Sequence, residues 1–214
     1  LLIKVVGGEP ADTTAPVITL TGDAVVLVEG GTTYSDAGAS ASDAENGDLT
    51  GSIVVTSTVD TGAVGSYSVT YNVVDEAGNA AEAVIKTVNV VDTTAPLITL
   101  SGDVTVTVEA GTSYNDAGAN ATDGYDGDLT ESVEVTGMVD VLKVGEYTLT
   151  YNVSDAAENA ALAVVRTVNV SDRTLPVITL EGNAVVQVEA GTSYIDAGAS
   201  ASDTLDGDLT GSIV

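Results

Sequence analysis

The stretch that decides the fold is residues 65–75, GSYSVTYNVVD. Large side chains at every second position from Tyr67 to Val73 alternate with small polar ones. This alternation is typical of a β-strand with one face on a hydrophobic core and the other in water. Helical periodicity is absent elsewhere, and the apolar residues are mostly Val, Ile, Leu and Ala, without Phe or Trp. The pattern therefore predicts an all-β protein.

The same stretch recurs 80 residues later, because it belongs to an internal repeat that covers almost the whole chain. The repeat begins with DTTAPVITL at residues 12–20, DTTAPLITL at 92–100 and DRTLPVITL at 172–180. The first two copies are identical at 49 of 80 positions. Copies this similar must share one fold.

Prolines near the start of each copy mark the domain boundaries. Pro16, Pro96 and Pro176 lack an N–H and have a fixed φ, which suits the beginning of an edge strand. The expected domains are a last strand and linker of a preceding repeat at 1–11, full repeats at 12–91 and 92–171, and a partial third repeat at 172–214.

Turn residues and alternation together predict the strands of the first copy. The expected strands lie near 16–20, 24–29, 33–37, 52–59, 66–74 and 82–91, with a short extra strand around 39–42. Seven short antiparallel strands form an Ig-like β-sandwich. Because an odd number of crossings brings each domain's end to the pole where the next begins, we expect tandem sandwich domains arranged end to end.

Composition excludes several functions. The chain has 32 acidic and 5 basic residues and a formal net charge of −27, so it repels nucleic acid and anionic membrane surfaces. It has no His and no Cys, which removes the commonest general base, thiolate metal sites and disulfides. No segment is apolar enough for membrane insertion. We expect no enzyme activity, since every candidate carboxylate repeats with the copies.

A set of motifs within each copy resembles a known family. The motifs are D-T-T-A-P-x-I-T-L-x-G, V-E-x-G-T-x-Y-x-D-A-G-A, G-D-L-T and V-G-x-Y-x-x-T-Y-N-V. Together they resemble the Ig-like repeats of bacterial surface proteins, which are related to hyalin-type repeats. The resemblance implies an extracellular location on the bacterial cell surface and a stalk or binding role. Tyr67 and Tyr147 look like the tyrosine corner of Ig folds.

Acidic and amide residues recur at equivalent positions of the copies. Calcium binds six to eight oxygens from carboxylates, amide side chains and carbonyls, and D-x-x-D-G-D at 123–128 resembles a short loop of that kind. The candidate calcium ligands at the domain junctions are Asp12, Glu29, Asp43, Asp48, Asp75, Asn79, Asp92, Glu109, Asp123, Asp126, Asp128, Asp155, Asn159, Asp172, Glu189, Asp203 and Asp208. The alternative is that these residues only form turns and caps through hydrogen bonds to nearby backbone. The strand assignment puts Asp92, Glu109, the 123–128 loop and the 155–159 turn at one pole of the second copy.

The sequence predicts a non-catalytic stalk or spacer of a repetitive bacterial adhesin or surface filament. The alternative is a ligand- or carbohydrate-binding module of a secreted protein. Expected partners are neighbouring repeats, other copies in a filament, and an unidentified surface or matrix ligand. Residues 1–6, LLIKVV, resemble AVIKTV at 83–88. They either end a preceding repeat of a longer chain or complete the third repeat of another copy by strand addition. A repeated lysine crosslink is not expected, since Lys86 is replaced by Arg166.

Overall fold

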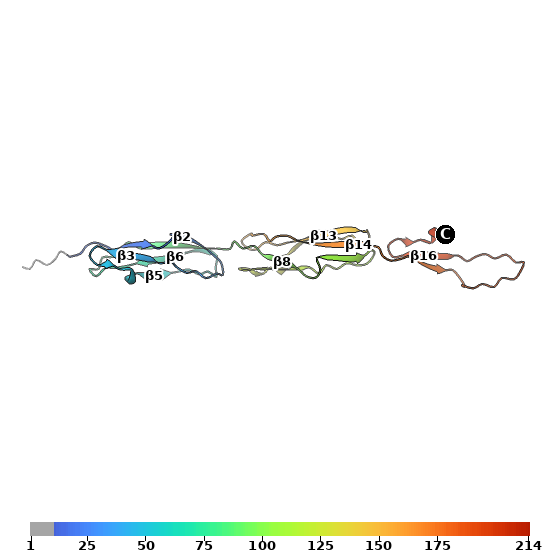
Figure 1. The fold of residues 1–214 in the computed structure, drawn as a ribbon, viewed down its shortest axis with the longest axis horizontal. Coiled ribbons are helices and arrows are strands. Elements are labelled where there is room, and N and C mark those ends of the chain that lie inside the picture. The colour runs from blue at the N-terminus through green and yellow to red at the C-terminus, as the bar shows by residue number, and fades with distance from the viewer. Residues whose placement is uncertain (1–10) are drawn as a thin grey trace, which may run out of the picture. The chain divides into compact units, whose positions relative to one another are not determined.

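The computed structural model describes residues 11–214, so the predicted strand at residues 1–6 lies outside the described residues. The chain divides into two compact units, Leu1–Thr94 and Ala95–Val214. Their described residues form β-strands and short 3₁₀ turns, without an α-helix, and Figure 1 labels several of the strands in each. No helix among them is long and apolar enough to span a bilayer. The all-β prediction is confirmed.

The first unit is a sandwich of two sheets. Its elements are β1 (Val17–Leu20), β2 (Val25–Glu29), β3 (Ala39–Asp43), β4 (Gly47–Asp48), η1 (Thr50–Ser52), β5 (Val54–Ser57), β6 (Gly65–Asn72) and β7 (Val84–Val91). One sheet has the order β1-β3-β4 and the other β2-β7-β6-β5. Six of the seven strands overlap predicted ones, whereas the two-residue β4 was not predicted. β1 lies at a sheet edge directly after Pro16, as expected.

The second unit repeats this architecture. Its elements are β8 (Leu97–Leu100), β9 (Thr105–Glu109), β10 (Ala119–Asp123), β11 (Gly127–Asp128), η2 (Thr130–Ser132), β12 (Glu134–Thr136), β13 (Gly145–Asn152), β14 (Val164–Ser171), β15 (Val177–Leu180), β16 (Ala199–Asp203), β17 (Gly207–Asp208) and η3 (Thr210–Ser212). The sheets are β11-β10-β8, β12-β13-β14-β9 and β15-β16-β17. Residues 172–214 form one three-stranded sheet, in which Ile178 is 64% exposed where Ile18 of the first copy is 9% exposed.

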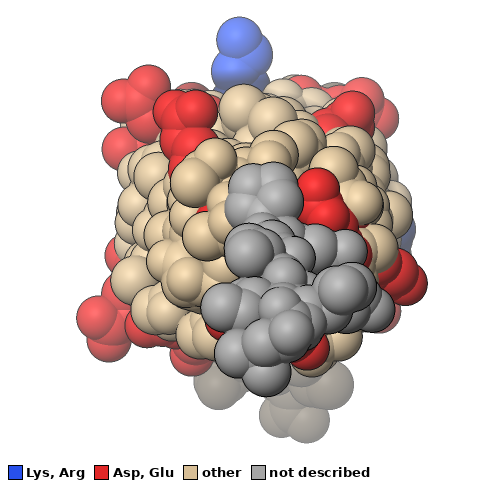
Figure 2. All heavy atoms as spheres, turned by 90° about the vertical axis from the view of Figure 1, so that its left-hand side faces the viewer, with Lys and Arg blue, Asp and Glu red and all other residues tan. Residues whose placement is uncertain are grey.

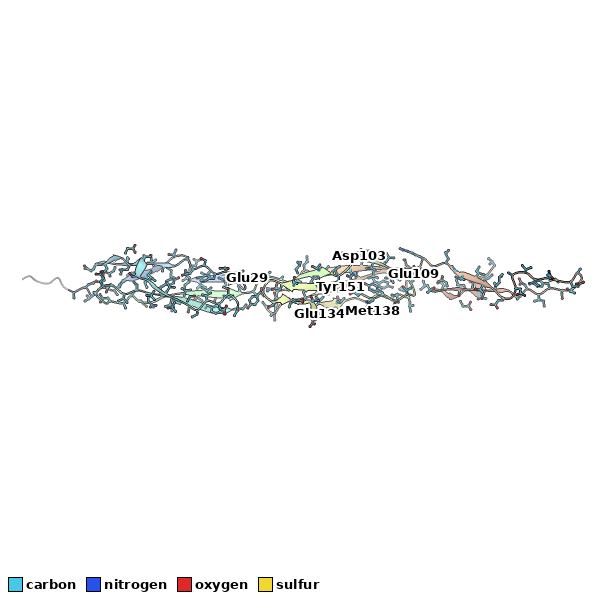
Figure 3. The ribbon with its side chains drawn as sticks, turned by 90° about the horizontal axis from the view of Figure 1, so that it is seen from below. Glu29, Asp103, Glu109, Glu134, Met138 and Tyr151 are labelled. Carbon is cyan, nitrogen blue, oxygen red and sulfur yellow. The ribbon has the colours of Figure 1, made fainter. Side chains whose placement is uncertain are left out.

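The core lies between the two sheets of each copy. In the first unit Ile18 and Ala41 of the small sheet pack against Val69, Tyr71 and neighbouring residues of the large sheet. The second unit buries the equivalent set, which includes Tyr151 (Figure 3). Val69 and Tyr71 are buried while the alternate residues of β6 are more exposed, so the inward-facing alternation predicted from residues 65–75 is confirmed.

Two details of the predicted strands are wrong. Residues 33–37 form a loop, and β2 pairs parallel with β7, with Val25 opposite Thr87 and Glu29 opposite Val91. Side chains hold this loop on the core, because Asp36 accepts hydrogen bonds from the buried side chains of Tyr71 and Lys86. The loop therefore does not need backbone hydrogen bonds to a neighbouring strand. The chain leaves the small sheet after β1 and joins the large one as β2, instead of forming a hairpin.

The tyrosine corner is present in both full copies. The Tyr67 hydroxyl donates a hydrogen bond to the Ala63 carbonyl at 2.8 Å, and Tyr147 donates to the Lys143 carbonyl at 2.8 Å. Each bond closes back on the backbone four residues upstream, which fixes the entry into the central strand.

Candidate metal centre

Three aspartates from distant parts of the first unit converge on one point. Asp12 precedes β1, Asp43 ends β3 and Asp75 follows β6. One carboxylate oxygen from each lies within 4.8 Å of the other two. Sequence analysis named all three residues as candidate ligands, and the fold brings them together.

The two carboxylate oxygens of Asp43 have different surroundings. Oδ1 accepts hydrogen bonds from the backbone N–H groups of Glu45 at 2.8 Å and Asn46 at 3.0 Å, which is the turn chemistry expected of an Asp before a tight loop. Oδ2 is buried and has no hydrogen-bond partner among the described residues, although Asp43 is only 8% exposed. Asp12 shows the same division, with Oδ1 bonded to the Thr14 N–H at 2.9 Å and Oδ2 buried without a partner there.

Asp75 is oriented by Asn79. Its Oδ1 accepts the Asn79 backbone N–H at 2.7 Å and its Oδ2 accepts the Asn79 side-chain amide at 2.8 Å. The same amide donates to the Asp12 carbonyl at 3.2 Å, so Asn79 joins two members of the cluster. Burial raises the pKa of Asp75, but these hydrogen bonds outweigh it and the pKa is lowered overall. Asp75 is therefore an anion.

An equivalent cluster is found in the third copy. Asp172, Asp203 and Asp206 have carboxylate oxygens within 4.8 Å of one another. Asp203 Oδ1 accepts the N–H groups of Leu205 and Asp206, whereas its Oδ2 is buried without a partner among the described residues. Sequence analysis named Asp172 and Asp203 but missed Asp206 and its counterpart Asn46. The signal was available, because D-x-x-[ND]-G-D recurs in all three copies.

In the second copy the candidate ligands fall in different units. Asp92 belongs to the first unit, and Asp123, Asp126, Asp155 and Asn159 belong to the second. Within the second unit, Asn159 binds both oxygens of Asp155 in the way Asn79 binds Asp75. Asp123 Oδ1 accepts the N–H of Asp126, and Asp126 Oδ2 accepts the N–H of Ala156 at 2.7 Å.

Other candidate ligands lie apart from these clusters in turns. Asp48, Asp128 and Asp208 each accept a backbone N–H at 2.9 Å from the threonine two residues on. Glu189 lies in an exposed segment of the third copy. The hydrogen bonds of these three aspartates are those expected if the residues only form turns.

Glu29 and Glu109 (labelled in Figure 3) are at the end of the copy that leads into the next linker. Glu29 Oε1 accepts the Thr93 N–H at 2.9 Å, the Thr94 N–H at 3.1 Å and the Thr94 hydroxyl at 2.6 Å, and Oε2 accepts the Thr93 hydroxyl at 2.8 Å. These bonds, the Thr94 hydroxyl first, lower the pKa of Glu29 to about 2. Glu109 likewise accepts the N–H groups of Arg173 and Thr174.

The predicted placement of Glu109 at the pole of the 123–128 loop is therefore wrong. In an antiparallel pairing this residue would lie at the entry side of its copy. The parallel pairing of β9 with β14 places Glu109 opposite Ser171 instead, at the exit.

Sequence analysis missed an ion pair in each full copy between a buried cation and a partly exposed aspartate. Lys86 on β7 is 1% exposed, and its Nζ donates to Asp36 at 2.8 Å and to the Thr21 carbonyl at 3.3 Å. The Tyr71 hydroxyl donates to the other Asp36 oxygen. Burial raises the pKa of Asp36, but the bonds from Lys86 and Tyr71 outweigh it and hold the pKa at about 2. Burial and the same carboxylate raise the pKa of Tyr71.

The second unit builds the same group with arginine. Arg166 is 1% exposed and donates to Asp116, to the Tyr151 hydroxyl at 3.0 Å and to three backbone carbonyls. Tyr151 also donates to Asp116. Both cations thus have hydrogen-bond partners within the core. This explains why a basic residue occurs at the equivalent positions 86 and 166, in strands whose neighbouring inward-facing residues are apolar.

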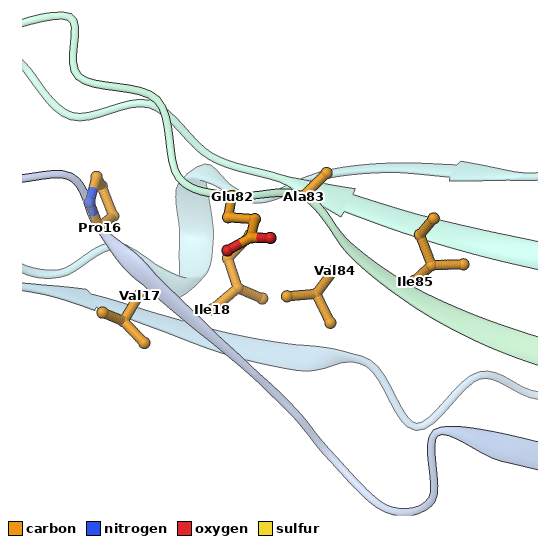
Figure 4. A pocket seen from close by; sticks show the side chains of 7 residues that line it. All are labelled: Pro16, Val17, Ile18, Glu82, Ala83, Val84 and Ile85. Atoms are coloured by element: carbon orange, nitrogen blue, oxygen red, sulfur yellow. The ribbon is translucent and has the colours of Figure 1, made fainter.

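A groove of about 410 Å³ lies between the edge of β1 and the start of β7, lined by residues 16–18 and 82–85. Figure 4 shows Ile18 and Val84 facing each other across it. Among its lining residues only Glu82 is charged, so the groove offers no set of convergent catalytic groups. The face in Figure 2 carries many acidic and few basic side chains, in line with the net charge.

Sandwich units that repeat along one chain, with turn motifs at their ends and a tyrosine corner, define an immunoglobulin-like repeat. This chain belongs to the family of bacterial surface protein, Ig-like domains, which matches residues 18–90 and 98–170. The resemblance seen in the sequence motifs is confirmed.

Relatives carry such sequences as parts of longer proteins. An uncharacterized 81.3 kDa protein of Acholeplasma phage L2 is 33% identical over 187 residues, which is 80% of this chain and 24% of that protein. Hyalin of Lytechinus variegatus is 34% identical over 137 residues, 62% of this chain and 26% of hyalin. Hyalin of Strongylocentrotus purpuratus is 35% identical over 136 residues, 60% and 11% respectively. The chain thus spans about a quarter or less of these relatives.

Solved structures resemble the chain more loosely. The M60 catalytic domain with the CBM51-1 and CBM51-2 domains of Clostridium perfringens ZmpB has a TM-score of 0.43 at 15% identity, over 86% of this chain and 33% of that one. CBM51-2 in complex with GlcNAc and INT domains, from the same protein, has a TM-score of 0.31 at 22% identity, over 41% and 20%. At these values neither likeness bears on function.

Proposed function

We propose that this chain is a non-catalytic, extracellular spacer segment of a repetitive bacterial surface protein, and that its aspartate clusters bind calcium. Membership of a family of surface Ig-like domains supports the location and the absence of chemistry. The two full copies keep the same core, the same turn aspartates and the same exit contacts. What repeats is therefore what holds a domain and its linker in place.

The buried, unpartnered oxygen of Asp43 is the observation that carries the calcium proposal. A buried anionic oxygen without a partner is costly, and two further carboxylates within 4.8 Å add repulsion. A divalent cation reverses both terms. The candidate ligand atoms of the three aspartates are all oxygens, which suits calcium. Water or carbonyl oxygens would complete the six to eight ligands that calcium requires.

The exit contacts support the spacer proposal. Glu29 binds the N–H and the hydroxyl of both Thr93 and Thr94, so the linker is held against the end of β2 by four hydrogen bonds. Because its pKa is about 2, Glu29 stays ionised and keeps these charge-assisted bonds throughout the physiological range. These bonds fix the first residues of the linker to the copy that precedes it.

Calcium is expected to stabilise the chain. Thermal unfolding of the full chain is followed in chelator, in a few millimolar calcium and in the same concentration of magnesium. For a site with an affinity of about 10⁻⁴–10⁻³ M, typical of extracellular modules, the gain is about 1–2 kcal/mol. That corresponds to a rise of several degrees in the first unit's melting temperature.

Asp43→Asn is the matched control for this experiment, because it keeps the turn acceptor and removes the charge. It is expected to abolish the calcium shift of the first unit and leave that of the third copy's segment. Equal melting curves of the unsubstituted chain in chelator and calcium would refute the calcium part of the proposal.

The spacer part is tested by small-angle X-ray scattering of the full chain. A compact domain of this length has a radius of gyration of about 17 Å. Domains arranged end to end are expected to give a clearly larger value with a narrow cross-section. A radius close to the compact value would contradict the spacer proposal, whatever the result with calcium. The binding-module alternative stays a prediction of the sequence.

A further inference from the structure

The turn that follows each buried aspartate carries a variable residue in front of an invariant Gly-Asp. That residue is Asn46 in the first copy, Asp126 in the second and Asp206 in the third. It is thus neutral in one copy and ionisable in the other two. The rest of the turn is closely matched, since Gly47 has a φ of 74° and Gly207 a φ of 73°.

In the third copy this residue belongs to the cluster. An oxygen of Asp206 lies within 4.8 Å of oxygens of Asp172 and Asp203. The turn geometry that places it there is repeated in the first copy, where the Asn46 N–H donates to Asp43 Oδ1 at 3.0 Å as Asp206 donates to Asp203 Oδ1 at 3.2 Å. The side chain of Asn46 therefore has the same route into the first cluster.

The burial and hydrogen bonding of the Asn46 side chain agree with a place beside the first cluster. Its Oδ1 is buried and has no hydrogen-bond partner among the described residues, as is true of Asp43 Oδ2 and Asp12 Oδ2. A buried amide oxygen without a partner is uncommon, and it costs free energy unless a donor or a cation faces it. Two carboxylate oxygens of the first cluster and the amide oxygen of Asn46, in the turn beside it, are thus buried without a partner among the described residues.

We propose that Asn46 is a further ligand of the first site, through its neutral amide oxygen, and that the residue at this position sets the affinity of each site for calcium. This inference rests on the proposed calcium binding. With Asn46 the first site combines three carboxylates with one amide. An Asp in its place raises the anionic charge of the ligand set by one, which strengthens calcium binding and destabilises the empty site. The number of charged ligands is a main determinant of calcium affinity in proteins.

Asn46→Asp in the full chain tests the inference, with Ala44→Asp as the matched control. Ala44 is exposed in the same loop, so it adds the same charge without adding a ligand. Calorimetric titration with calcium is expected to show at least about tenfold tighter binding at the first site for Asn46→Asp, and little change for Ala44→Asp. Asp206→Asn is the reciprocal variant, and it is expected to weaken the third copy's site by a similar factor.

Amide hydrogen exchange of residues 39–50 gives a readout that does not depend on calcium binding. In chelator, Asn46→Asp is expected to exchange faster than the unsubstituted chain, because a fourth carboxylate joins an empty cluster, whereas Ala44→Asp has a small effect. With calcium the order reverses for Asn46→Asp.

The possible outcomes separate the two proposals. If calcium has no effect on any variant but Asn46→Asp still accelerates exchange in chelator, the side chain lies in the cluster and the calcium proposal is wrong. If Asn46→Asp and Ala44→Asp behave alike in both conditions, Asn46 is not part of the site, even where calcium binds.

Discussion

Replacing Lys86 by methionine is expected to destabilise the first unit by about 1–3 kcal/mol, because the Asp36 carboxylate, whose side chain is 24% exposed, loses its charged partner. Lys86 is 1% exposed, and Asp36 would keep only the tyrosine hydroxyls of its present strong partners. Urea unfolding, followed by hydrogen exchange in peptides of β6 and β7, reports the loss for this unit separately from the second.

Lys86→Arg is the control for this prediction. The second unit shows that the site accepts arginine, since Arg166 occupies the equivalent position with Asp116 and Tyr151 as partners. We therefore expect a much smaller loss than for Lys86→Met. A methionine variant as stable as the arginine variant would show that the charge contributes nothing and that packing of the side chain alone is needed.

Acid is expected to weaken the first unit through Asp36. Its pKa is lowered from 3.8 to about 2 in the folded protein, so folding favours the ionised form. The stabilisation is fully present above the unfolded pKa and is lost as the pH falls from about 4 to about 2. Because Asp36 is partly exposed, solvent screening reduces this contribution, and we expect a loss of about 1 kcal/mol. Unfolding free energies measured from pH 6 to pH 2 give this dependence.

Asp36→Asn isolates that contribution. The chain carries many other carboxylates, and their protonation relieves repulsion at the same pH, so the total curve mixes opposing effects. The difference between the unsubstituted chain and Asp36→Asn removes the shared part. This difference is expected to shrink as the pH falls towards 2, and a difference that is constant with pH would contradict the pKa of Asp36 given above.

The central strands could be predicted from the sequence because burial alternates along them. Residues 65–75 show the inward face directly, and β6 has that face buried. The parallel pairing of β2 could not be predicted in the same way. A five-residue strand such as Val25–Glu29 has similar alternation whether it forms a hairpin or changes sheet, and the choice depends on which partner offers a free edge.

The candidate site was predictable where recurrence and chemistry agree. Asp43 and Asp75 have aspartate counterparts beside the same turns of the second copy, and both belong to the cluster with Asp12. The cluster member Asp206 was missed because its counterpart in the first copy is the amide Asn46, so a carboxylate does not recur at this position in every copy. The ion pair of Lys86 was missed because a lysine in a strand is usually exposed. Only the fold shows that Lys86 is buried and that its partner is the loop residue Asp36.

The parallel pairing of β2 with β7 has a mechanical consequence. These strands lie near the beginning and the end of a copy, and five residue pairs from Val25 opposite Thr87 to Glu29 opposite Val91 join them. Tension on the two ends of the copy pulls these strands past each other lengthwise. The hydrogen bonds between them are then loaded in shear and must break together, whereas a hairpin loaded at its open end would unzip one bond at a time. The first unit is therefore built to resist pulling along its chain.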